Sequence, residues 1–264
     1  MAPRYQSLAH ELMDLARLPI DDQYRSRPFF IVGAARSGTT LLRVMLDSHS
    51  DLSIGPETNV LHRWFEAASS AKTLGFFPYA LDEIQRYPAA ALELLLLRYT
   101  RERGKKRWGD KTPNYTPVLG QILTCWPESQ VIHCVRDGRD VVCSMQQRWG
   151  WNVGAAAKRW AERVEAVLLY AERLGPERYI EVRYESLVAN PERQLRRLLS
   201  FLGEVWDPEV LNYASSPHDG MTDVPEAGLA ISVASVGRWK DEMSTLDLVR
   251  FRRRAGPLLE RLGY

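Results

Sequence analysis

The chain has 264 residues, of which 35 are basic and 33 acidic, giving a formal net charge of +2. A charge so close to balance provides no strong field for a polyanion, which argues against a dedicated nucleic-acid-binding protein. Hydrophobic residues make up 45% of the chain and charged residues 26%, as in ordinary globular proteins. A chain of this length can bury a full core without disulfides or metal ions.

The cysteine content and the length of the apolar runs bear on where in the cell the protein is expected. Three cysteines with no CxxC pair predict neither a disulfide framework nor a zinc site. The N-terminal stretch is amphipathic and contains acidic residues, unlike a signal peptide. The longest apolar run, at 91–97, is far shorter than the roughly 18 residues needed to cross a bilayer. We therefore expect a cytoplasmic protein without a membrane span.

Predicted strands and helices alternate along the chain. Compact apolar runs predict three buried strands, at 29–33, 130–135 and roughly 178–184. Helical periodicity or capping residues predict helices at 1–18, 39–47, 155–173 and 190–203. In the last of these, Asn190 is the expected N-cap and Gly203 the stop. This alternation predicts a parallel sheet covered by helices on both faces.

The remaining segments have weaker patterns. Residues 60–107 contain many aromatic residues but no clear strand, and 214–237 is a long stretch rich in small residues. Long loops in compact domains are usually mobile or functional. The C-terminal residues predict a closing helix that is interrupted near Gly256 and Pro257. With no repeat and no convincing linker, residues 1–264 are interpreted as a single domain.

A glycine-rich turn follows the first predicted strand. The run from Gly33 to Thr40, GAARSGTT, has the length of the phosphate-binding loop GxxxxGK[ST]. Such a turn directs backbone N–H groups and a helix N-terminus at a phosphate. Thr39 stands where that loop carries its lysine, which disfavours an ordinary ATP or GTP hydrolase. Arg36, inside the turn, can supply a cation instead.

The stretch 29–58, FFIVGAARSGTTLLRVMLDSHSDLSIGPET, resembles the 5′-phosphosulfate loop of sulfotransferases that use 3′-phosphoadenosine 5′-phosphosulfate (PAPS). It is most similar to the branch with tyrosylprotein sulfotransferases and many bacterial enzymes, whose pattern is PRSGTTL(L/M)R…LD.H, with Ala35 replacing the proline. The resemblance implies a P-loop-like three-layer α/β fold with a central parallel sheet flanked by helices. It also implies PAPS as co-substrate, 3′-phosphoadenosine 5′-phosphate (PAP) as product and no metal ion. The residues it assigns to the 5′-phosphate and sulfate are Arg36, Ser37, Gly38, Thr39 and Thr40.

A second motif, RDGRDVVCS from Arg136 to Ser144, resembles the family's 3′-phosphate motif, in which a strand is followed by RDPRD…S. Gly138 replaces the usual proline. An arginine fork suits a dianionic phosphate, and Ser144 can grip the same phosphate. Taken alone, RDGRD is equally consistent with a charged turn that forms local salt bridges.

Two shorter segments extend the resemblance. Tyr184, in VRYESL, matches a tyrosine that contacts the nucleotide in the family. The run GRWK from Gly237 resembles the segment that closes over the cofactor, so Arg238 or Lys240 is expected to reach the phosphates. The stretch 214–240 is therefore expected to cover the cofactor.

The acceptor side requires a base, because a hydroxyl is weakly nucleophilic until its proton is removed. Pro113, in DKTP, stands where cytosolic family members carry a histidine. The other branch uses a glutamate after the first helix, and the resemblance assigns this role to Glu57. It also implies that Lys111 stabilises the leaving oxygen, that Arg36 adds positive charge there, and that Asp110 can hold Lys111 in place. Residues 60–107 are expected to recognise the acceptor.

Two other functions stay open. A small-molecule kinase with a degenerate phosphate loop would need a magnesium-binding carboxylate, for which Asp137 and Asp140 are candidates. A catalytically inactive protein would bind the nucleotide without turnover. The acceptor itself stays open among a small molecule, a sugar, a lipid alcohol and a tyrosyl peptide.

Overall fold

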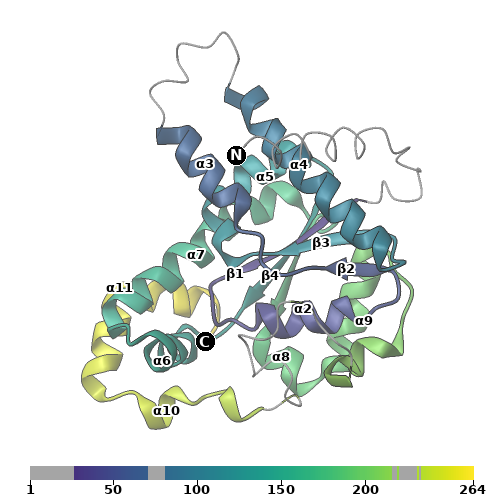
Figure 1. The fold of residues 1–264 in the computed structure, drawn as a ribbon. Coiled ribbons are helices and arrows are strands. Elements are labelled where there is room, and N and C mark those ends of the chain that lie inside the picture. Colours follow the sequence, from purple (N-terminus) through teal and green to yellow (C-terminus); the bar gives the residue numbers. More distant parts are fainter. Residues whose placement is uncertain (1–26, 71–80, 216–218, 220–230, 232) are drawn as a thin grey trace, which may run out of the picture.

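The computed structural model describes residues 27–70, 81–215, 219, 231 and 233–264, with backbone alone at 67–70 and 81–87. The helix predicted at 1–18 and most of the stretch at 214–237 lie outside these residues. The described residues are built around a central sheet with helices on both sides (Figure 1).

The sheet is parallel and its five strands lie in the order β2-β3-β1-β4-β5. The strands are β1 Phe29–Gly33, β2 Leu52–Ile54, β3 Arg107–Lys111, β4 Gln130–Val135 and β5 Tyr179–Arg183. Three of them, β1, β4 and β5, confirm the predicted strands. The parallel sheet predicted from the alternation of elements is confirmed as well.

Helices cover both faces. The α-helices are α2 Thr39–Asp47, α3 Val60–Ser70, α4 Leu81–Glu102, α5 Leu119–Cys125, α6 Gly138–Trp149, α7 Val153–Leu174, α8 Tyr184–Ala189, α9 Pro191–Leu202, α10 Trp239–Glu242 and α11 Thr245–Arg261. Short 3₁₀ helices lie at η3 Pro113–Val118, η4 Pro208–Leu211, η5 Tyr213–Ser215 and η7 Val233–Ser235. Side chains of β1 alternate between the faces. Phe29 and Ile31 pack in the cluster formed with α2 and α9, and Phe30 and Val32 pack in the cluster formed with α4, α5 and η3. The expected three-layer α/β fold is confirmed.

Two strands carry little signal in the sequence. β2 has only three residues, and β3 reads RWGDK, so neither forms an apolar run. The prediction that 60–107 holds no strand is wrong at its end, because β3 begins at Arg107. This arginine is buried in the sheet because its guanidinium donates to the carbonyl of Leu202 and to Glu204.

The predicted interruption of the C-terminal helix is also wrong. α11 continues through Pro257 to Arg261. One face of this helix, including Phe251 and Leu259, packs in a buried cluster with α6 and α7, and this packing outweighs the local cost of proline. In α9, Gly203 ends the helix in a left-handed conformation as predicted, whereas the Asn190 side chain makes no capping hydrogen bond.

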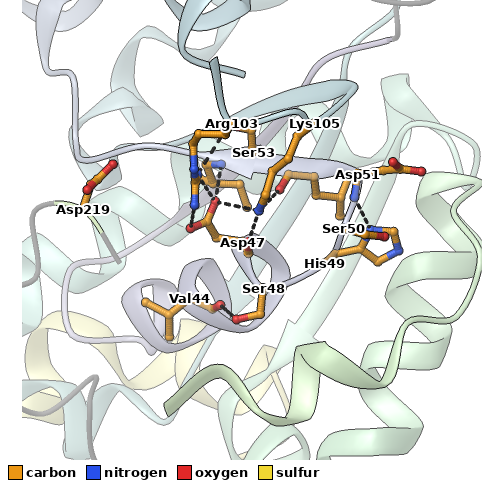
Figure 2. Close-up of polar contacts among 12 residues, drawn as sticks. Val44, Asp47, Ser48, His49, Ser50, Asp51, Ser53, Arg103, Lys105 and Asp219 are labelled. Atoms are coloured by element: carbon orange, nitrogen blue, oxygen red, sulfur yellow. Dashed lines mark hydrogen bonds and ion pairs between the residues drawn. The ribbon is translucent and has the colours of Figure 1, made fainter. Parts of the chain in front are cut away.

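A buried ion network fixes the end of β2 (Figure 2). The fully buried Asp47 carboxylate, at the end of α2, accepts hydrogen bonds from Arg103 at 2.6 and 2.9 Å and from the Ile54 backbone N–H at 2.8 Å. Lys105 donates to the carbonyls of Asp47 and Leu52. The network joins α2, β2 and the segment that follows α4. It therefore determines where the chain leaves β2 toward Glu57.

Candidate functional site

The candidate residues lie where the strands end. Because the carboxyl ends of parallel strands meet at one edge of the sheet, the segments that follow them lie side by side. Along that edge, from β2 to β5, the order is Glu57, Lys111, the glycine-rich turn, Arg136 and Tyr184. The structure thus brings the sequence-predicted residues to a single edge.

The glycine-rich turn leads from β1 into α2. The backbone N–H of Ser37 donates to the carbonyl of Ala34, and Gly38 stands at the N-cap with a φ of 89°. A side chain at Gly38 would be strained by this φ, and its Cβ would lie 2.3 Å from the ring of Tyr184. Among the described residues no side chain caps α2, and its first turn contains no acidic residue. This helix start is therefore suited to an anion.

One hydroxyl in this turn has no hydrogen-bond partner among the described residues. The Ser37 side chain is buried, and its Oγ makes no hydrogen bond with any part of the chain that the structure describes. Buried polar groups are nearly always hydrogen-bonded in folded proteins. The donor set of the turn therefore fits a phosphate or sulfate group.

Arg36 joins the two predicted phosphate motifs. Its Nε donates to Ser144 Oγ at 2.9 Å, and its carbonyl accepts from Arg136 at 3.1 Å. Arg136 is buried, which lowers the pKa of its guanidinium, and its Cζ lies 4.5 Å from the centre of the Tyr184 ring. The Nε of Arg136 makes no hydrogen bond among the described residues. Arg36 is thus directed at the motif predicted to hold the 3′-phosphate, although it was also expected to serve the 5′ side.

Gly138 has a packing role. A Cβ there would lie 2.6 Å from the ring of Trp160, which is fully buried. The same ring leaves no room for the proline of the family motif. The adjacent Asp137 caps α6 by accepting from the backbone N–H of Arg139, and it also forms an ion pair with the Arg139 side chain.

The segment 233–239, which we call the strap, lies against the nucleotide-side residues. Ser235 accepts from Arg136 through its carbonyl, and its hydroxyl lies 2.7 Å from that of Tyr184. The buried Asp140 carboxylate accepts from the backbone N–H groups of Gly237 and Trp239 at 2.8 and 3.0 Å. The expected covering segment therefore contacts the site in its described part.

Arg238 lies at the rim of this region. Its side chain donates to Glu242 at 2.8 Å and to Gln147 at 2.9 Å. Burial is the largest cause of the lowered pKa of Arg136, and the positive charge of Arg238 adds to it. Nearby acidic groups oppose both effects. Sequence reasoning missed Ser235, because an isolated serine in a stretch of small residues gives no signal of its own.

Lys111 and Glu57 form an ion pair at the other end of the edge. The ammonium group of Lys111 contacts the Glu57 carboxylate and donates to the Thr40 hydroxyl at 3.3 Å. The Lys111 side chain is 3% exposed and that of Glu57 39%. Burial lowers the pKa of Lys111, and the charge of Glu57 opposes this effect. A buried cation therefore lies beside the helix start of α2, and a solvent-accessible carboxylate lies next to it.

Asp110 takes a different partner from the expected one. Its buried carboxylate accepts a hydrogen bond from Thr58 at 2.9 Å, whereas Lys111 is held by Glu57 and Thr40. Burial raises the pKa of Asp110 to about 6, against the opposing effect of hydroxyls from Thr112 and Thr58. Thr58 itself was missed by sequence reasoning.

Within the described ranges, no group of three or more histidine, cysteine or acidic side chains could hold a metal ion. None of the helices in those ranges is long and apolar enough to cross a membrane.

Comparisons with known proteins identify the family and the fold. A sequence profile of the sulfotransferase family matches residues 28–208, and the chain belongs to that family. Protein-tyrosine sulfotransferase 1 of Danio rerio is 30% identical over 258 residues, which cover 89% of this chain and 71% of the relative. The sulfotransferase domain of the Synechococcus PCC 7002 olefin synthase superposes with a TM-score of 0.67 at 24% identity, covering 92% of this chain and 97% of the domain. A mouse sulfotransferase complexed with PAP gives a TM-score of 0.50 at 16% identity, covering 90% of each chain, and at these identities the two structures show the shared fold.

Proposed function

We propose that the chain transfers a sulfuryl group from PAPS to a hydroxyl acceptor and releases PAP. One observation carries the proposal: a single sheet edge places a turn suited to an anion beside the Arg136–Ser144 motif and, at its other end, beside the Glu57–Lys111 pair. Membership of the sulfotransferase family and the PAP complex of the mouse structural neighbour support it.

The donor substrate is assigned to the nucleotide side. Ser37, Gly38, Thr39 and Thr40 hold the 5′-phosphate and sulfate, because they form the uncapped start of α2 and include the hydroxyl without a partner. Arg136 and Ser144 hold the 3′-phosphate, with Arg36 between the two phosphate groups. Tyr184 contacts the nucleotide, and Arg238 adds positive charge from the strap.

The transfer step is assigned to Glu57 and Lys111. As the acceptor oxygen forms its bond to sulfur, Glu57 takes the acceptor's proton. The bond between sulfur and the bridging oxygen breaks, and its electron pair stays on the 5′-phosphate. Lys111 and Arg36 offset the negative charge that grows on this leaving oxygen. We propose that no metal ion takes part.

The acceptor is a hydroxyl compound recognised by residues 60–107. The described end of this stretch reaches the base segment, because the ring of Tyr99 lies against Gly55, two residues before Glu57. The name of the Danio rerio relative makes a tyrosyl peptide one acceptor to test, alongside small phenols, sugars and lipid alcohols.

The two carboxylates that a kinase would need to bind magnesium, Asp137 and Asp140, have other partners. Asp137 caps α6 and pairs with Arg139, and Asp140 holds the strap through two backbone N–H groups. Both carboxylates are therefore committed to other partners. We do not propose phosphoryl transfer for this chain.

The proposal is tested by supplying labelled PAPS with a panel of hydroxyl acceptors, with and without a chelator, and labelled ATP in parallel. We expect label transfer from PAPS that the chelator leaves unchanged, and none from ATP. Transfer from ATP, or binding of PAP with no transfer to any acceptor class, contradicts the proposal. Loss of transfer with the chelator contradicts the metal-free step alone.

A further inference from the structure

We propose that Thr58 is a positioning residue, whose hydroxyl, held between Asp110 and Tyr115, sets the Glu57 carboxylate against Lys111. The inference rests on the proposed role of Glu57 as the base. It adds a residue that touches neither the acceptor nor the donor in that proposal.

The base needs such support because it lies on irregular backbone. Residues 55–59 form neither helix nor strand between β2 and α3, and the Glu57 side chain is partly exposed. A carboxylate on such a segment has many accessible positions unless its neighbours are fixed. Misplacing a reacting group by about 1 Å can lower a rate by about 10².

Thr58 is fixed through both its backbone and its side chain. Its backbone N–H donates to the hydroxyl of Thr112 at 3.2 Å, and its own hydroxyl donates to Asp110 at 2.9 Å. The same hydroxyl is in contact with that of Tyr115. All of these partners lie in 110–115, the segment that also carries Lys111.

The contacts form a consistent chain of donors and acceptors. The backbone N–H of Leu61 donates to the Tyr115 oxygen at 3.3 Å, the Tyr115 hydroxyl donates to Thr58, and Thr58 donates to Asp110. Asp110 is 2% exposed and Tyr115 is fully buried, so water does not compete for these bonds. Hydrogen bonds in series strengthen one another in such surroundings.

A second link reinforces the first. The side-chain amide of Asn114 donates to that of Asn59 at 2.9 Å, and Asn59 has a φ of 52°. A positive φ is uncommon for residues other than glycine, and asparagine is one of the few that adopt it readily. The backbone on the C-terminal side of Glu57 is thus held by two consecutive residues, and the Thr58 hydroxyl is the central contact.

The test compares Thr58→Val, which keeps the shape of the side chain, with Thr58→Ser, which keeps the hydroxyl. We expect kcat to fall by about 10- to 100-fold in Thr58→Val and to stay within about threefold of wild type in Thr58→Ser. The Kd for PAP should stay within about twofold in both. Thr100→Val is the matched control, because the Thr100 hydroxyl is fully buried and makes no hydrogen bond among the described residues.

A double-mutant cycle with Glu57→Gln separates positioning from a structural role. Because Thr58 acts through the base, Thr58→Val should lower kcat by less than about threefold when Glu57 is already glutamine. The proposal is overturned if Thr58→Val lowers kcat as much in the Glu57→Gln protein as in wild type. It is also overturned if Thr58→Val weakens PAP binding as much as it lowers kcat. If Glu57→Gln alone has no effect, the proposed base fails, whatever Thr58 does.

Tyr115→Phe provides a second variant if Thr58→Val does not fold. It removes the hydroxyl that contacts Thr58 in the same series of hydrogen bonds, and it leaves the Thr58 side chain in place. We expect a smaller fall in kcat, about three- to tenfold, again without a change in PAP affinity. An unchanged kcat in a folded Tyr115→Phe protein contradicts the proposal.

Discussion

The two ends of the sheet edge are built on opposite principles. At the nucleotide end, beyond β1, β4 and β5, the buried Ser37 hydroxyl and the Nε of Arg136 make no hydrogen bond among the described residues. At the acceptor end, beyond β2 and β3, Lys111 is bonded to Glu57, and Thr58 to one oxygen of Asp110. The other Asp110 oxygen, which is an acceptor and not a donor, makes no hydrogen bond among the described residues. The nucleotide end is therefore suited to bind an anion, whereas the Glu57–Lys111 pair and the Thr58–Asp110 hydrogen bond of the acceptor end are already formed.

This difference separates binding from chemistry. Groups that gain partners only when the donor substrate arrives contribute to its affinity, whereas groups already in place contribute to turnover. Substitutions at the nucleotide end should therefore change Kd most, and those at the acceptor end kcat.

The largest effect is expected for Glu57→Gln. The substitution keeps the shape of the side chain and removes the proton acceptor, so kcat should fall by about 10²–10⁴. The Kd for PAP, measured by calorimetry, should stay within a few-fold of wild type. An aliphatic alcohol is the better acceptor for this assay, because an acidic phenol depends less on a base.

Near-normal turnover in Glu57→Gln would place the base elsewhere at the acceptor end. His62, on α3, would then be the next residue to replace. His133 is not suitable, because it is fully buried within β4, where burial lowers its pKa to about 3, and its Nδ1 pairs with the hydroxyl of Tyr179.

Arg136→Ala tests the nucleotide end. Each hydrogen bond to a charged group contributes about 1.5–3 kcal/mol, so PAP affinity should fall by about 10- to 100-fold. The affinity for adenosine 5′-phosphosulfate, which lacks the 3′-phosphate, should change by less than about threefold, and kcat at saturating PAPS should stay near wild type. An equal loss for both nucleotides would mean that Arg136 does not hold the 3′-phosphate.

Asp110 makes the acceptor end sensitive to pH. The carboxyl has a pKa of about 6 in the folded protein against an ordinary 3.8, because burial disfavours its charge. Below about pH 4 it is protonated in both states. As pH rises through 6, the unfolded chain has already lost the proton that the folded chain still holds, so the free energy of unfolding falls by up to about 3 kcal/mol.

Asp110→Asn removes this titration. Denaturant unfolding of both proteins from pH 4 to pH 7 should show wild type losing stability relative to the variant as pH rises. The part of the difference that does not change with pH reflects the altered hydrogen bond to Thr58. A difference that stays constant over the whole range would contradict the raised pKa. A difference that grows in the opposite direction would contradict the raised pKa.

Sequence patterns predicted the nucleotide end far better than the acceptor end. The glycine-rich turn and the Arg136–Ser144 motif are continuous in sequence, and each follows an apolar strand that the pattern reveals. The acceptor end follows β2 and β3, which are a three-residue strand and a strand containing three charged residues. Their burial depends on long-range partners such as Glu204 for Arg107, which a local pattern does not contain.

The direction of side chains was likewise beyond the sequence. Arg36 was predicted as a site residue and Asp110 was expected to hold Lys111, yet Arg36 bonds to Ser144, 108 positions away, and Asp110 to Thr58, 52 positions away. The strap is a second example, because the sequence gives no sign that the Asp140 carboxylate accepts a hydrogen bond from the backbone N–H of Gly237. Motifs locate residues, and contacts between distant segments determine what each residue can do.

The smallest effect is expected for Ser37→Ala, which tests the contrast between the nucleotide end and the acceptor end. Removing a buried hydroxyl that makes no hydrogen bond with any described residue should leave the ligand-free protein as stable as wild type, or more stable by up to about 1 kcal/mol. PAP affinity should fall by about two- to tenfold, the value of one net hydrogen bond. Thr58→Val, a comparable loss of a hydroxyl at the acceptor end, should do the opposite and lower stability while PAP affinity holds. Thermal unfolding of the two variants with and without PAP measures both quantities. If Ser37→Ala destabilises the ligand-free protein as much as Thr58→Val does, the Ser37 hydroxyl already has a partner, and the contrast between the two ends does not hold.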